Sequence, residues 1–575
     1  MKKLFKYFKN YRKECVLGPL FKMLEACFEL IVPLVMAKII DIGIANLDSG
    51  YVIKMCLVLV LLGLVGLVCS ITAQYFAAKA SVGFAAKLRH EMFLHISSLS
   101  YTEIDNIGTN TMITRMTSDL NQLQNGVNLT LRLFLRSPFV VFGAMIMAFT
   151  IDVPSALIFA AAIPVLAVVV FGIMLACIPL YKKVQSKLDR VLGRTRQNLT
   201  GVRVIRAFNK EKEETESFNE ENEELTSVSK FVGKISALMN PVTYVIINVA
   251  IAALIWTGAI RVDGGMLTKG AVVALYNYMS QILIELIKLA NLIITMTKAA
   301  ACANRISDVL EIENSMKQEE KPQPFRDMSA GVCFNHVYLK YSGAGEEALT
   351  DIDFCVKSGQ TAGIIGGTGS GKSSVVNMVA RFYDATSGSV CVFGTDVKKL
   401  SLTELRRKIG IVPQKAVLFS GTIRENLKWG NENATDEEIY DALKIAQAAE
   451  IVENKEKGLD YIIEQGGKNL SGGQRQRLTI ARALVKRPDI LILDDSASAL
   501  DFKTDAMLRT AIKNLKYKPT VFIVSQRTSS IMNADIIIVL DDGKILDKGT
   551  HDELLSRCEI YKEIYASQFS KEAAK

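Results

Sequence analysis

The sequence is poor in histidine and has no closely paired cysteines. Its 575 residues include four histidines and ten cysteines, and the cysteines form no CxxC pair. Metal sites built from cysteine and histidine need these ligands at short spacings, so the distribution predicts no metal centre of that kind. Cys27, Cys56, Cys69 and Cys177 stand inside apolar runs. We therefore expect the cysteines to be buried, apolar thiols in a reducing compartment.

The chain also lacks a concentrated basic patch and a cleavable signal. Its formal net charge is +9, but the basic residues are spread along the sequence, which argues against a nucleic-acid partner. The clearest basic cluster precedes the first apolar run and consists of Lys2, Lys3, Lys6, Lys9, Arg12 and Lys13. Under the positive-inside rule this cluster predicts a cytoplasmic N-terminus. The apolar run after it is too long for a signal peptide, and no small-residue cleavage pattern follows.

Long apolar runs fill the first half of the chain. Hydrophobic residues make up 50% of the sequence and its mean hydropathy is +0.23, which is high for a soluble protein. A membrane-spanning helix needs about 20 apolar residues. The candidate spans are about 16–40, 53–78, 131–151, 153–181, 235–260 and 270–297. The sequence therefore predicts six spans, although the first and the last carry charged residues.

The connections between these spans alternate in length. The first, third and fifth are short, whereas the second and fourth run about 50 residues each and are rich in Lys, Arg and Glu. Long, charged loops of helix-favouring composition predict that the spanning helices continue into the cytoplasm. A polar stretch with Pro322 and Pro324, 312–328, predicts a linker. After about Gly331 the apolar runs become short and alternate with helical stretches, which is typical of an α/β domain.

A glycine-rich segment follows a short apolar strand in this second half. Thr361–Ile365 leads into Gly366-Gly-Thr-Gly-Ser-Gly-Lys-Ser373, and a helix is expected from Ser373 onward. Strand, glycine loop and helix in this order make a phosphate-binding loop, because backbone N–H groups and the helix N-terminus point at the phosphates. Lys372 is expected to contact the β- and γ-phosphates, and Ser373 to ligate Mg²⁺.

Two further motifs stand about a hundred residues downstream. They are Leu470-Ser-Gly-Gly-Gln-Arg-Gln-Arg477 and Ile490-Leu-Ile-Leu-Asp-Asp495. In this order and spacing, the three motifs resemble the ATP-binding cassette of ABC transporters. The resemblance implies an α-helical membrane domain of the exporter type with six spans, followed by an α/β nucleotide-binding domain. The expected boundaries are 1–311 for the membrane domain, 312–328 for the linker and 329–575 for the ATPase domain.

The resemblance also implies the ligands of ATP and Mg²⁺. Tyr341 matches the aromatic residue that stacks on adenine, although an ordinary strand tyrosine is the alternative. The expected Mg²⁺ ligands are Ser373, Gln414 and Asp494. The residues expected to hold the nucleotide of this chain are Tyr341, Gly366, Gly367, Thr368, Gly369, Ser370, Gly371, Lys372, Ser373, Ser374 and Asp494.

A second set of nucleotide contacts is expected to serve a partner. Ser471, Gly472, Gly473 and Gln474 precede a helix, but the spacing argues that they cannot reach the phosphates bound by Lys372. The resemblance implies that they close over the ATP of a second subunit, with Asp501 in the loop that crosses between the two. In the membrane half, the family's coupling helices correspond to segments near Ser100–Asn110 and Val204–Glu214.

Two residues depart from the family's pattern. The family has Glu after the Mg²⁺-binding aspartate and a switch histidine after a later strand, where this chain has Asp495 and Gln526. Asp is one methylene shorter, and a misplacement of about 1 Å can cost about 10²-fold in rate. Gln can donate a hydrogen bond but carries no positive charge. With Gln414, these are the candidate catalytic residues, and we expect this site to bind ATP well and hydrolyse it slowly; neutral drift in an active site is the alternative.

The charged residues in the predicted spans have two possible interpretations. Lys22, Glu25 and Glu29 share one face of the first span, and Glu285 lies one turn from Lys288 in the last. Intramembrane charges face a cavity or one another. The glutamates could therefore attract cationic groups of a substrate along a translocation pathway, or they could form structural ion pairs.

The combined prediction is one half of an ATP-driven exporter in the bacterial cytoplasmic membrane. Its partner would be a second, non-identical half-transporter, and its substrate a small hydrophobic compound, a lipid or a peptide. The alternatives are a nucleotide-gated channel or regulator, a weakly active homodimeric exporter, and an importer that uses the same machinery. The long cytoplasmic loops argue against the importer.

Overall fold

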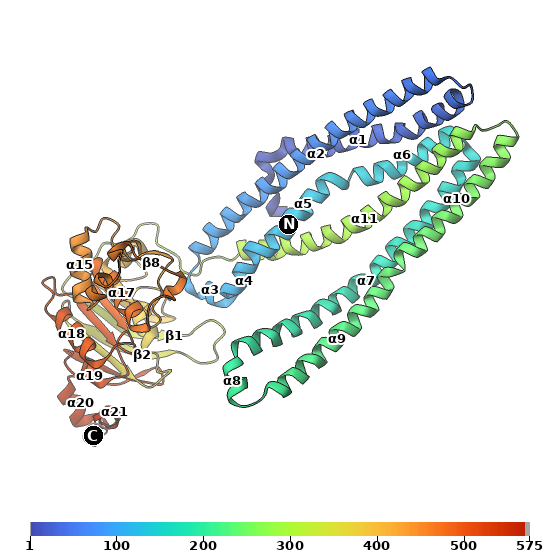
Figure 1. Ribbon diagram of the computed structural model, residues 1–575. Coiled ribbons are helices and arrows are strands. Elements are labelled where there is room, and N and C mark those ends of the chain that lie inside the picture. The colour runs from blue at the N-terminus through green and yellow to red at the C-terminus, as the bar shows by residue number, and fades with distance from the viewer. Residues whose placement is uncertain (1, 570–575) are drawn as a thin grey trace. The chain divides into compact units, whose positions relative to one another are not determined.

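The computed structural model describes residues 2–569 and divides into two compact units (Figure 1). The first unit comprises Met1–Ser97 and Asn110–Ile312, and the second comprises Ser98–Thr109 and Glu313–Lys575. Residue 1 and residues 570–575, the end of the expected ATPase domain, lie outside the described part. So do the side chains of Lys2 and Lys3, two members of the expected N-terminal basic cluster.

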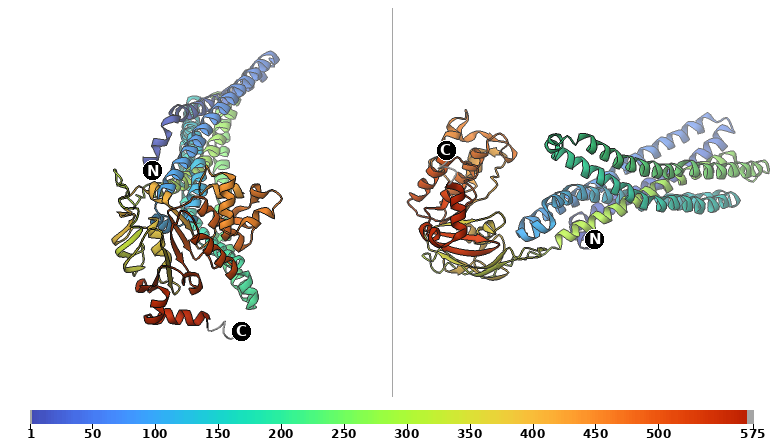
Figure 2. Two further views of the ribbon diagram at one scale, coloured as in Figure 1. Left: turned by 90° about the vertical axis from the view of Figure 1, so that its left-hand side faces the viewer. Right: turned by 90° about the horizontal axis from the view of Figure 1, so that it is seen from below.

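The first unit is entirely helical. Its elements are η1 (Lys2–Tyr11), α1 (Arg12–Lys38), η2 (Ile39–Ile44), α2 (Ser49–Ser98), α4 (Thr109–Thr114), η3 (Arg115–Asp119), α5 (Leu120–Leu133), α6 (Arg136–Ile151), α7 (Val153–Thr200), α8 (Val202–Ala207), α9 (Glu211–Ala237), α10 (Met239–Asp263) and α11 (Lys269–Leu310). Figure 1 shows α7 lying beside α9 and α10, with which it is in contact, and Figure 2 shows the same unit from two further directions.

Helix α7 shows that the long polar loops continue the spanning helices. It begins where the Asp152 carboxylate accepts a hydrogen bond from the backbone N–H of Ser155, 3.0 Å away, which caps the first turn. It then runs for 48 residues. At 1.5 Å per residue this is roughly 70 Å, more than twice the hydrocarbon thickness of a bilayer. The prediction that spanning helices continue well beyond the apolar runs is confirmed.

Five helical segments are long and apolar enough to cross a membrane. They are Ser49–Ser98, Thr109–Ile151, Val153–Thr200, Glu211–Asp263 and Lys269–Leu310. The expected first span is also a helix, α1, and it packs on α6 and α11, but Lys22, Glu25 and Glu29 make it too polar to qualify by composition. The count of six spans therefore stays a prediction.

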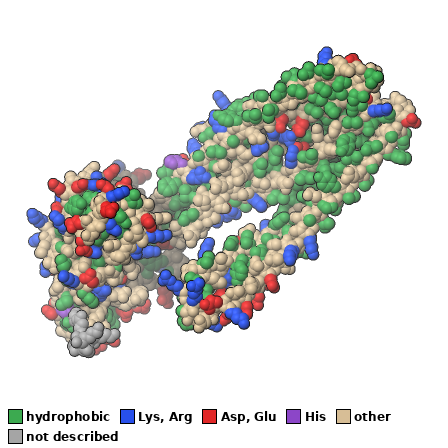
Figure 3. All heavy atoms as spheres, in the orientation of Figure 1, with side chains coloured by type: hydrophobic (Ala, Val, Ile, Leu, Met, Phe, Trp, Pro, Cys, Tyr) green, Lys and Arg blue, Asp and Glu red, His purple; other side chains and the backbone are tan. Residues whose placement is uncertain are grey.

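The charges in these helices are paired with one another. Arg136 on α6 donates to Glu285 on α11 and to Glu29 on α1, each at 2.6 Å. Glu285 also accepts from Ser137 and Lys288, each at 2.8 Å, and Lys22 pairs with Glu25 at 2.5 Å. Figure 3 shows acidic and basic side chains grouped among the hydrophobic side chains of this unit. The structure therefore forms ion pairs of the kind that the structural alternative predicts, and contact of these glutamates with a substrate stays a prediction.

The second unit is built on a six-stranded sheet in the order β12-β11-β3-β10-β9-β6. A four-stranded sheet in the order β2-β1-β4-β5 and a two-stranded sheet, β7-β8, accompany it. The strands are β1 (Val332–Leu339), β2 (Leu349–Val356), β3 (Thr361–Gly366), β4 (Ser387–Val392), β5 (Thr395–Asp396), β6 (Ile409–Val412), β7 (Gly421–Thr422), β8 (Ile462–Ile463), β9 (Ile490–Asp494), β10 (Thr520–Val524), β11 (Ile536–Asp541) and β12 (Lys544–Gly549).

Helices cover both faces of the six-stranded sheet. They are α12 (Lys372–Val379), α13 (Leu402–Lys408), α14 (Ile423–Lys428), α15 (Asp436–Ile445), α16 (Ala449–Glu453), α17 (Gly472–Val485), α18 (Phe502–Lys513), α19 (Thr528–Ile531), α20 (His551–Arg557) and α21 (Glu559–Phe569), with short 3₁₀ turns η4 (Gly458–Asp460) and η5 (Gln465–Gly467). Ile364 of β3 packs in the core that contains α12, and its neighbour Ile365 packs in the core that contains α19 and α20. Burial on both faces explains why β3 and β9 are continuous apolar runs.

The expectation about cysteines is only partly right. Cys69 and Cys177 are buried free thiols, but Cys56 is exposed on α2. Cys333 and Cys355 form a disulfide. They stand opposite each other in the antiparallel pairing of β1 with β2, with Cα atoms 4.2 Å apart. This register, which the cysteine spacing alone does not reveal, brings the two sulfur atoms together.

We expect the Arg136 ion pairs to be needed for folding of the membrane unit. Arg136→Met leaves the buried carboxylate of Glu285 without its main partner, and breaking such a pair costs about 3–5 kcal/mol. The measurement is the thermal stability of the full chain in detergent, followed by size-exclusion chromatography. The double variant R136M/E285M should recover most of the loss, and K288M, at a half-exposed position, should lose little. Equal losses in R136M and in the double variant would contradict this account.

Candidate functional site

The phosphate-binding loop predicted from the sequence joins β3 to α12. Gly369 and Gly371 have φ values of +87° and +89°, a left-handed conformation that side chains other than glycine rarely adopt. A Cβ on Gly366 would lie 2.1 Å from the carbonyl oxygen of Leu540 on the neighbouring strand β11. These three glycines are therefore required by the backbone path itself.

Lys372 begins α12 and its ammonium group lies against its own loop. Nζ donates to the carbonyl oxygens of Gly366, 2.9 Å away, and Gly367. It also lies 3.3 Å from the hydroxyl of Ser370. Burial lowers the pKa of Lys372, and the nearby carboxylates of Asp495 and Asp494 oppose that shift. Without this positive charge, the carboxylates of Asp494 and Asp495 would repel the oxygens of a bound phosphate.

Asp494 is the buried acid of the site. It ends β9, is 7% exposed, and accepts a 3.0 Å hydrogen bond from the hydroxyl of Ser373. Burial raises its pKa, and the adjacent Asp495 raises it further. A divalent cation would relieve this cost directly, because it stabilises the ionised carboxylate.

The three expected Mg²⁺ ligands meet in one place. Gln414 follows β6, and its amide nitrogen donates to Asp495 at 3.4 Å. With Ser373 and Asp494 it lines a cavity of about 310 Å³ at the carboxyl ends of β3, β9 and β10. Hydroxyl, carboxylate and amide oxygens are ligands that Mg²⁺ prefers, so the residues present fit this ion.

The same cavity contains most of the expected nucleotide contacts of this chain. Those that line it are Tyr341, Thr368, Gly369, Gly371, Lys372, Ser373, Ser374, Gln414, Asp494, Asp495 and Gln526. Gly366, Gly367 and Ser370 complete the loop behind this lining, where the Ser370 hydroxyl donates to the carbonyl of Gly367 at 2.9 Å. Ala348, Val524 and Ser525 also line the cavity and were not expected. Ser525 stands directly before the expected residue Gln526 at the end of β10. This position in the sequence is the signal by which Ser525 could have been predicted to line the cavity.

The two departures from the family's pattern face this cavity together. Asp495 has φ +45°, and Asp is one of the few residues besides glycine that tolerate this conformation. Gln526 is exposed, and its backbone carbonyl accepts a 2.7 Å hydrogen bond from Gln568 on α21. Both side chains therefore border the space in which a terminal phosphate and a water molecule would have to meet.

The second expected set of contacts lies elsewhere in the unit. Ser471 caps α17: its hydroxyl accepts from the backbone N–H of Gln474, whose side chain accepts from the backbone N–H of Ser471 at 2.9 Å. Gly472 and Gly473 form the first turn of that helix. Asp501 caps α18 by accepting from Thr504 at 2.8 Å. Within residues 2–569, the cavity lining includes neither Ser471 to Gln474 nor Asp501.

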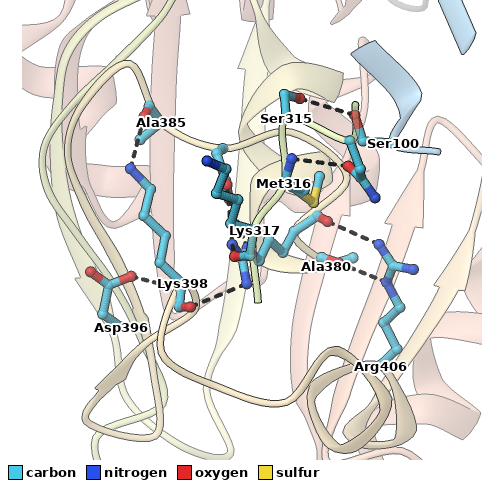
Figure 4. Close-up of polar contacts among 12 residues, drawn as sticks. Ser100, Ser315, Met316, Lys317, Ala380, Ala385, Asp396, Lys398 and Arg406 are labelled. Carbon is cyan, nitrogen blue, oxygen red and sulfur yellow. Dashed lines mark hydrogen bonds and ion pairs between the residues drawn. The ribbon is translucent and has the colours of Figure 1, made fainter. Parts of the chain in front are cut away.

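The first expected coupling segment contacts the ATPase fold. Helix α3 (Tyr101–Ile107) belongs to the second unit, and the Tyr383 hydroxyl donates to Asp105 at 2.6 Å. The Tyr101 ring lies 4.7 Å from that of Phe382. Figure 4 shows Ser100, directly before α3, pointing toward Ser315, with their hydroxyls 3.3 Å apart. The second segment, Val204–Glu214, covers the end of α8 and the start of α9, and both helices pack on α7.

Tyr383 links this helix to the cavity and was missed in the sequence. Its ring meets that of Tyr341 edge to face, with centroids 5.0 Å apart. Tyr341 in turn shares a 2.8 Å hydrogen bond with Ser374 in the helix that follows the loop. Tyr383 stands 42 positions from Tyr341 in a stretch without a recognisable motif, so only the fold brings them together.

Replacing Asp494 with Asn should stabilise the protein and abolish its response to Mg²⁺–ATP. Folding raises the pKa of Asp494, so the folded state binds this proton more tightly than the unfolded state. The free energy of unfolding therefore falls as the pH rises from the unfolded to the folded pKa, and the full destabilisation is present at pH 7. Asn removes the charge but can still accept from Ser373. The check is thermal unfolding of the full chain at pH 7 with and without Mg²⁺–ATP.

The predicted gain in melting temperature should shrink as the pH falls toward the unfolded pKa of about 3.9. Asp489→Asn serves as the control, because its carboxylate is half-exposed, lies outside the cavity and loses only a pair with Lys408 at the surface. A D494N protein with an unchanged melting temperature and an undiminished Mg²⁺–ATP shift would contradict this account.

Comparisons with known proteins agree with this arrangement. The family described as ABC transporter transmembrane region matches residues 15–286, and the family described as ABC transporter matches residues 349–498. The ABC transporter ATP-binding protein MT1311 of Mycobacterium tuberculosis is 36% identical over 571 residues, 98% of this chain and 97% of the relative. The ATP-dependent lipid A-core flippase of Desulfotalea psychrophila is 32% identical over 480 residues, 84% of each chain.

A solved structure supports the fold as a whole. A bacterial Atm1-family ABC exporter with ATP bound superimposes with a TM-score of 0.80 at 23% identity, covering 97% of this chain and 98% of the other. The helical unit and the ATPase unit therefore together have the exporter fold. On the length and identity of these matches, the chain belongs to the ABC transporters, as an ATP-hydrolysing transporter with the fold of an ABC exporter.

Proposed function

We propose that this chain is the slowly hydrolysing half of a heterodimeric exporter. The observation that carries the proposal is the placement of Asp495 and Gln526 on the same cavity as Lys372, Ser373 and Asp494. Groups that bind the phosphates and Mg²⁺ are retained, whereas both groups that the family uses to activate water are replaced. Binding and hydrolysis are thus separated within one site.

The chemistry of the cavity supports this division. Bound ATP and Mg²⁺ would supply the terminal phosphate and its charge neutralisation. Lys372 and the loop N–H groups would hold the phosphates, while Ser373, Gln414 and Asp494 would hold the ion. Asp495 would have to orient the attacking water with a side chain one methylene shorter than Glu. Gln526 would donate a hydrogen bond to the terminal phosphate without adding positive charge.

The Ser471–Gln474 segment matches the family's pattern and supports the proposal of a partner subunit. Ser471 and Gly472 are exposed at the N-terminus of α17, a helix of 14 residues, where backbone N–H groups favour an anion. We propose that this terminus completes a second ATP site whose loop, glutamate and histidine belong to a non-identical half-transporter. The exposed apolar side chains of Val204 and Phe208 at α8 support a further contact with that subunit.

The proposed setting is the bacterial cytoplasmic membrane. We propose residues 1–311 as the membrane domain, 312–328 as the linker and 329–575 as the cytoplasmic ATPase domain. The exposed basic residues Lys6, Lys9, Arg12 and Lys13 support a cytoplasmic N-terminus. The substrate is proposed to be a small hydrophobic compound, a lipid or a peptide, and the relative named as a lipid flippase supports an amphipathic one.

The two halves of the cassette should respond differently to substitution. In the complex with its partner, Asp495→Asn should change ATP hydrolysis little, because this site contributes little turnover. Ser471→Arg should nearly abolish it, because the bulky side chain blocks the partner's nucleotide. Steady-state ATPase activity of the purified complex is the measurement, and K372A, which removes ATP binding at this chain's site, controls for loss of nucleotide.

The chain alone supplies the complementary test. It should bind ATP and turn it over very slowly, and D495E/Q526H should raise the rate by about 10²-fold, since Glu restores the reach and His the charge. Fast turnover by the unmodified chain alone would instead indicate an active homodimer.

The hydrogen bond between Tyr383 and Asp105 should hold α3 on the ATPase fold. Tyr383→Phe keeps the ring against Tyr341 but loses a hydrogen bond worth about 1 kcal/mol, so α3 amides should exchange about fivefold faster. Hydrogen-exchange mass spectrometry of the full chain measures this, together with ATP affinity, which should not change. Tyr338→Phe, on β1, is the matched control. Unaltered exchange in Y383F would show that the hydrogen bond does not hold the helix.

A further inference from the structure

An apolar cavity lies beneath the N-terminal helix of the first unit. It has a volume of about 330 Å³, within the range of small-molecule pockets. Residues from η1, α1, α2, α5 and α11 enclose it, among them Phe8, Phe84, Val127, Met296 and Ala300. The lining residues that the structure describes carry no charged side chain. Water would find few hydrogen-bond partners in such a space, so an apolar occupant is favoured.

The packing of the surrounding helices keeps this cavity open. Phe8 of η1 stacks on Phe84 of α2 with ring centroids 4.1 Å apart, which fixes the lid. On the other side α5 and α11 are in close contact, because a Cβ on Gly126 would lie only 2.2 Å from that of Ala299. Neither wall can move inward without breaking these contacts, so the space does not close by small side-chain adjustments.

Basic residues stand on and just after η1, the helix that supplies Leu4 and Phe8 to the cavity lining, and we call them the basic rim. Helix η1 buries Leu4 and Tyr7 and exposes Lys6 and Lys9, which is the pattern of an amphipathic helix at a membrane surface. Arg12 and Lys13 follow, both exposed. The first acidic residue, Glu14, is paired with Lys79 at 3.0 Å. The rim therefore presents a net positive charge toward an anionic headgroup.

The depth of the cavity matches a membrane interface. Phe84 follows the apolar run 53–78 of α2, and Met296 and Ala300 lie where the apolar run 270–297 of α11 ends. Lys79 and Lys298 stand at the same two transitions. Lipid headgroups and the first part of their acyl chains occupy this level, on the side where basic residues gather.

We propose that this cavity binds one acyl chain of an anionic phospholipid from the adjacent leaflet, with the phosphate held at Lys6 and Lys9. The chain buries its apolar surface between Phe84 and Ala300, and the headgroup stays at the basic rim. Such a lipid would fasten η1 to α2, α5 and α11. The site is separate from the nucleotide cavity, and binding there requires neither the partner subunit nor ATP.

Photolabelling of the full chain in lipid nanodiscs tests the site. The probe is phosphatidylglycerol with a diazirine in one acyl chain, present as a trace in phosphatidylcholine, and the labelled positions are mapped by peptide mass spectrometry. Labels are expected on lining residues such as Phe84, Val127 and Met296. Labels confined to outward positions of α2, such as Leu61 and Leu64, would show ordinary bilayer contact and overturn the proposal.

A matched pair of substitutions separates filling of the cavity from a change in the helix. Ala300→Phe places a ring in the cavity and should reduce labelling of the lining at least tenfold. Ala301→Phe makes the same change at the adjacent, exposed position and should leave labelling unchanged. Val127→Phe fills the cavity from α5 and gives a second, independent test should A300F not fold. Unreduced labelling in a folded filling variant overturns the proposal.

The basic rim is tested with the headgroup. The unmodified chain should label several-fold more strongly with the phosphatidylglycerol probe than with a phosphatidylcholine probe that carries the same chain. The double variant K6Q/K9Q should reduce this ratio to about one while labels remain inside the cavity. Equal labelling by the two probes in the unmodified chain overturns the proposed headgroup contact and with it the proposal.

Discussion

The parallel pairing of β3, β10 and β9 is the constraint on which the nucleotide site depends. Val524 lies opposite both Ile364 and Asp494, so three strands end at one edge of the sheet. The glycine loop, Asp494 and Gln526 follow these ends and therefore meet, although they are far apart in sequence. Since the strands are buried on both faces, an acid at their end is buried too. That burial raises the pKa of Asp494 and makes a cation at this position favourable.

The parts of this site that the sequence predicts are those with a local physical reason. The loop can be recognised because residues other than glycine rarely adopt the φ of Gly369 and Gly371. Asp494 can be recognised because it ends an apolar strand. Tyr383 could not be found in this way, because its two contacts, Tyr341 and Asp105, depend on strand order and on the path of the first long loop. The Cys333–Cys355 pair depends on register, which spacing does not specify.

In the membrane unit too, local features can be predicted from the sequence and contacts between distant residues cannot. Apolar runs and charged loops predict long helices, because length and hydropathy are properties of continuous segments. The partner of a buried charge is a property of packing: Arg136 stands 149 positions from Glu285 and pairs with it directly. The charges of α1 that obscure it as a span by composition are in contact with charges on the same helix or on its neighbours. A hydropathy criterion therefore fails to identify a spanning helix when the helix carries charged groups that are paired inside the bundle.

Buried charges have opposite consequences in the two units. In the membrane unit both terminal nitrogens of Arg136 are bonded to carboxylates, so the charges join three helices and leave little attraction for a further ion. In the ATPase unit Lys372 is hydrogen-bonded to its own loop, and Asp494 has the hydroxyl of Ser373 as its hydrogen-bond partner. These charges are near but not paired, so phosphate and a divalent cation each find a partner. Binding of ATP and Mg²⁺ draws on these groups and not on Asp495 or Gln526. For this reason we propose that the two departures from the family's pattern slow hydrolysis and leave binding intact.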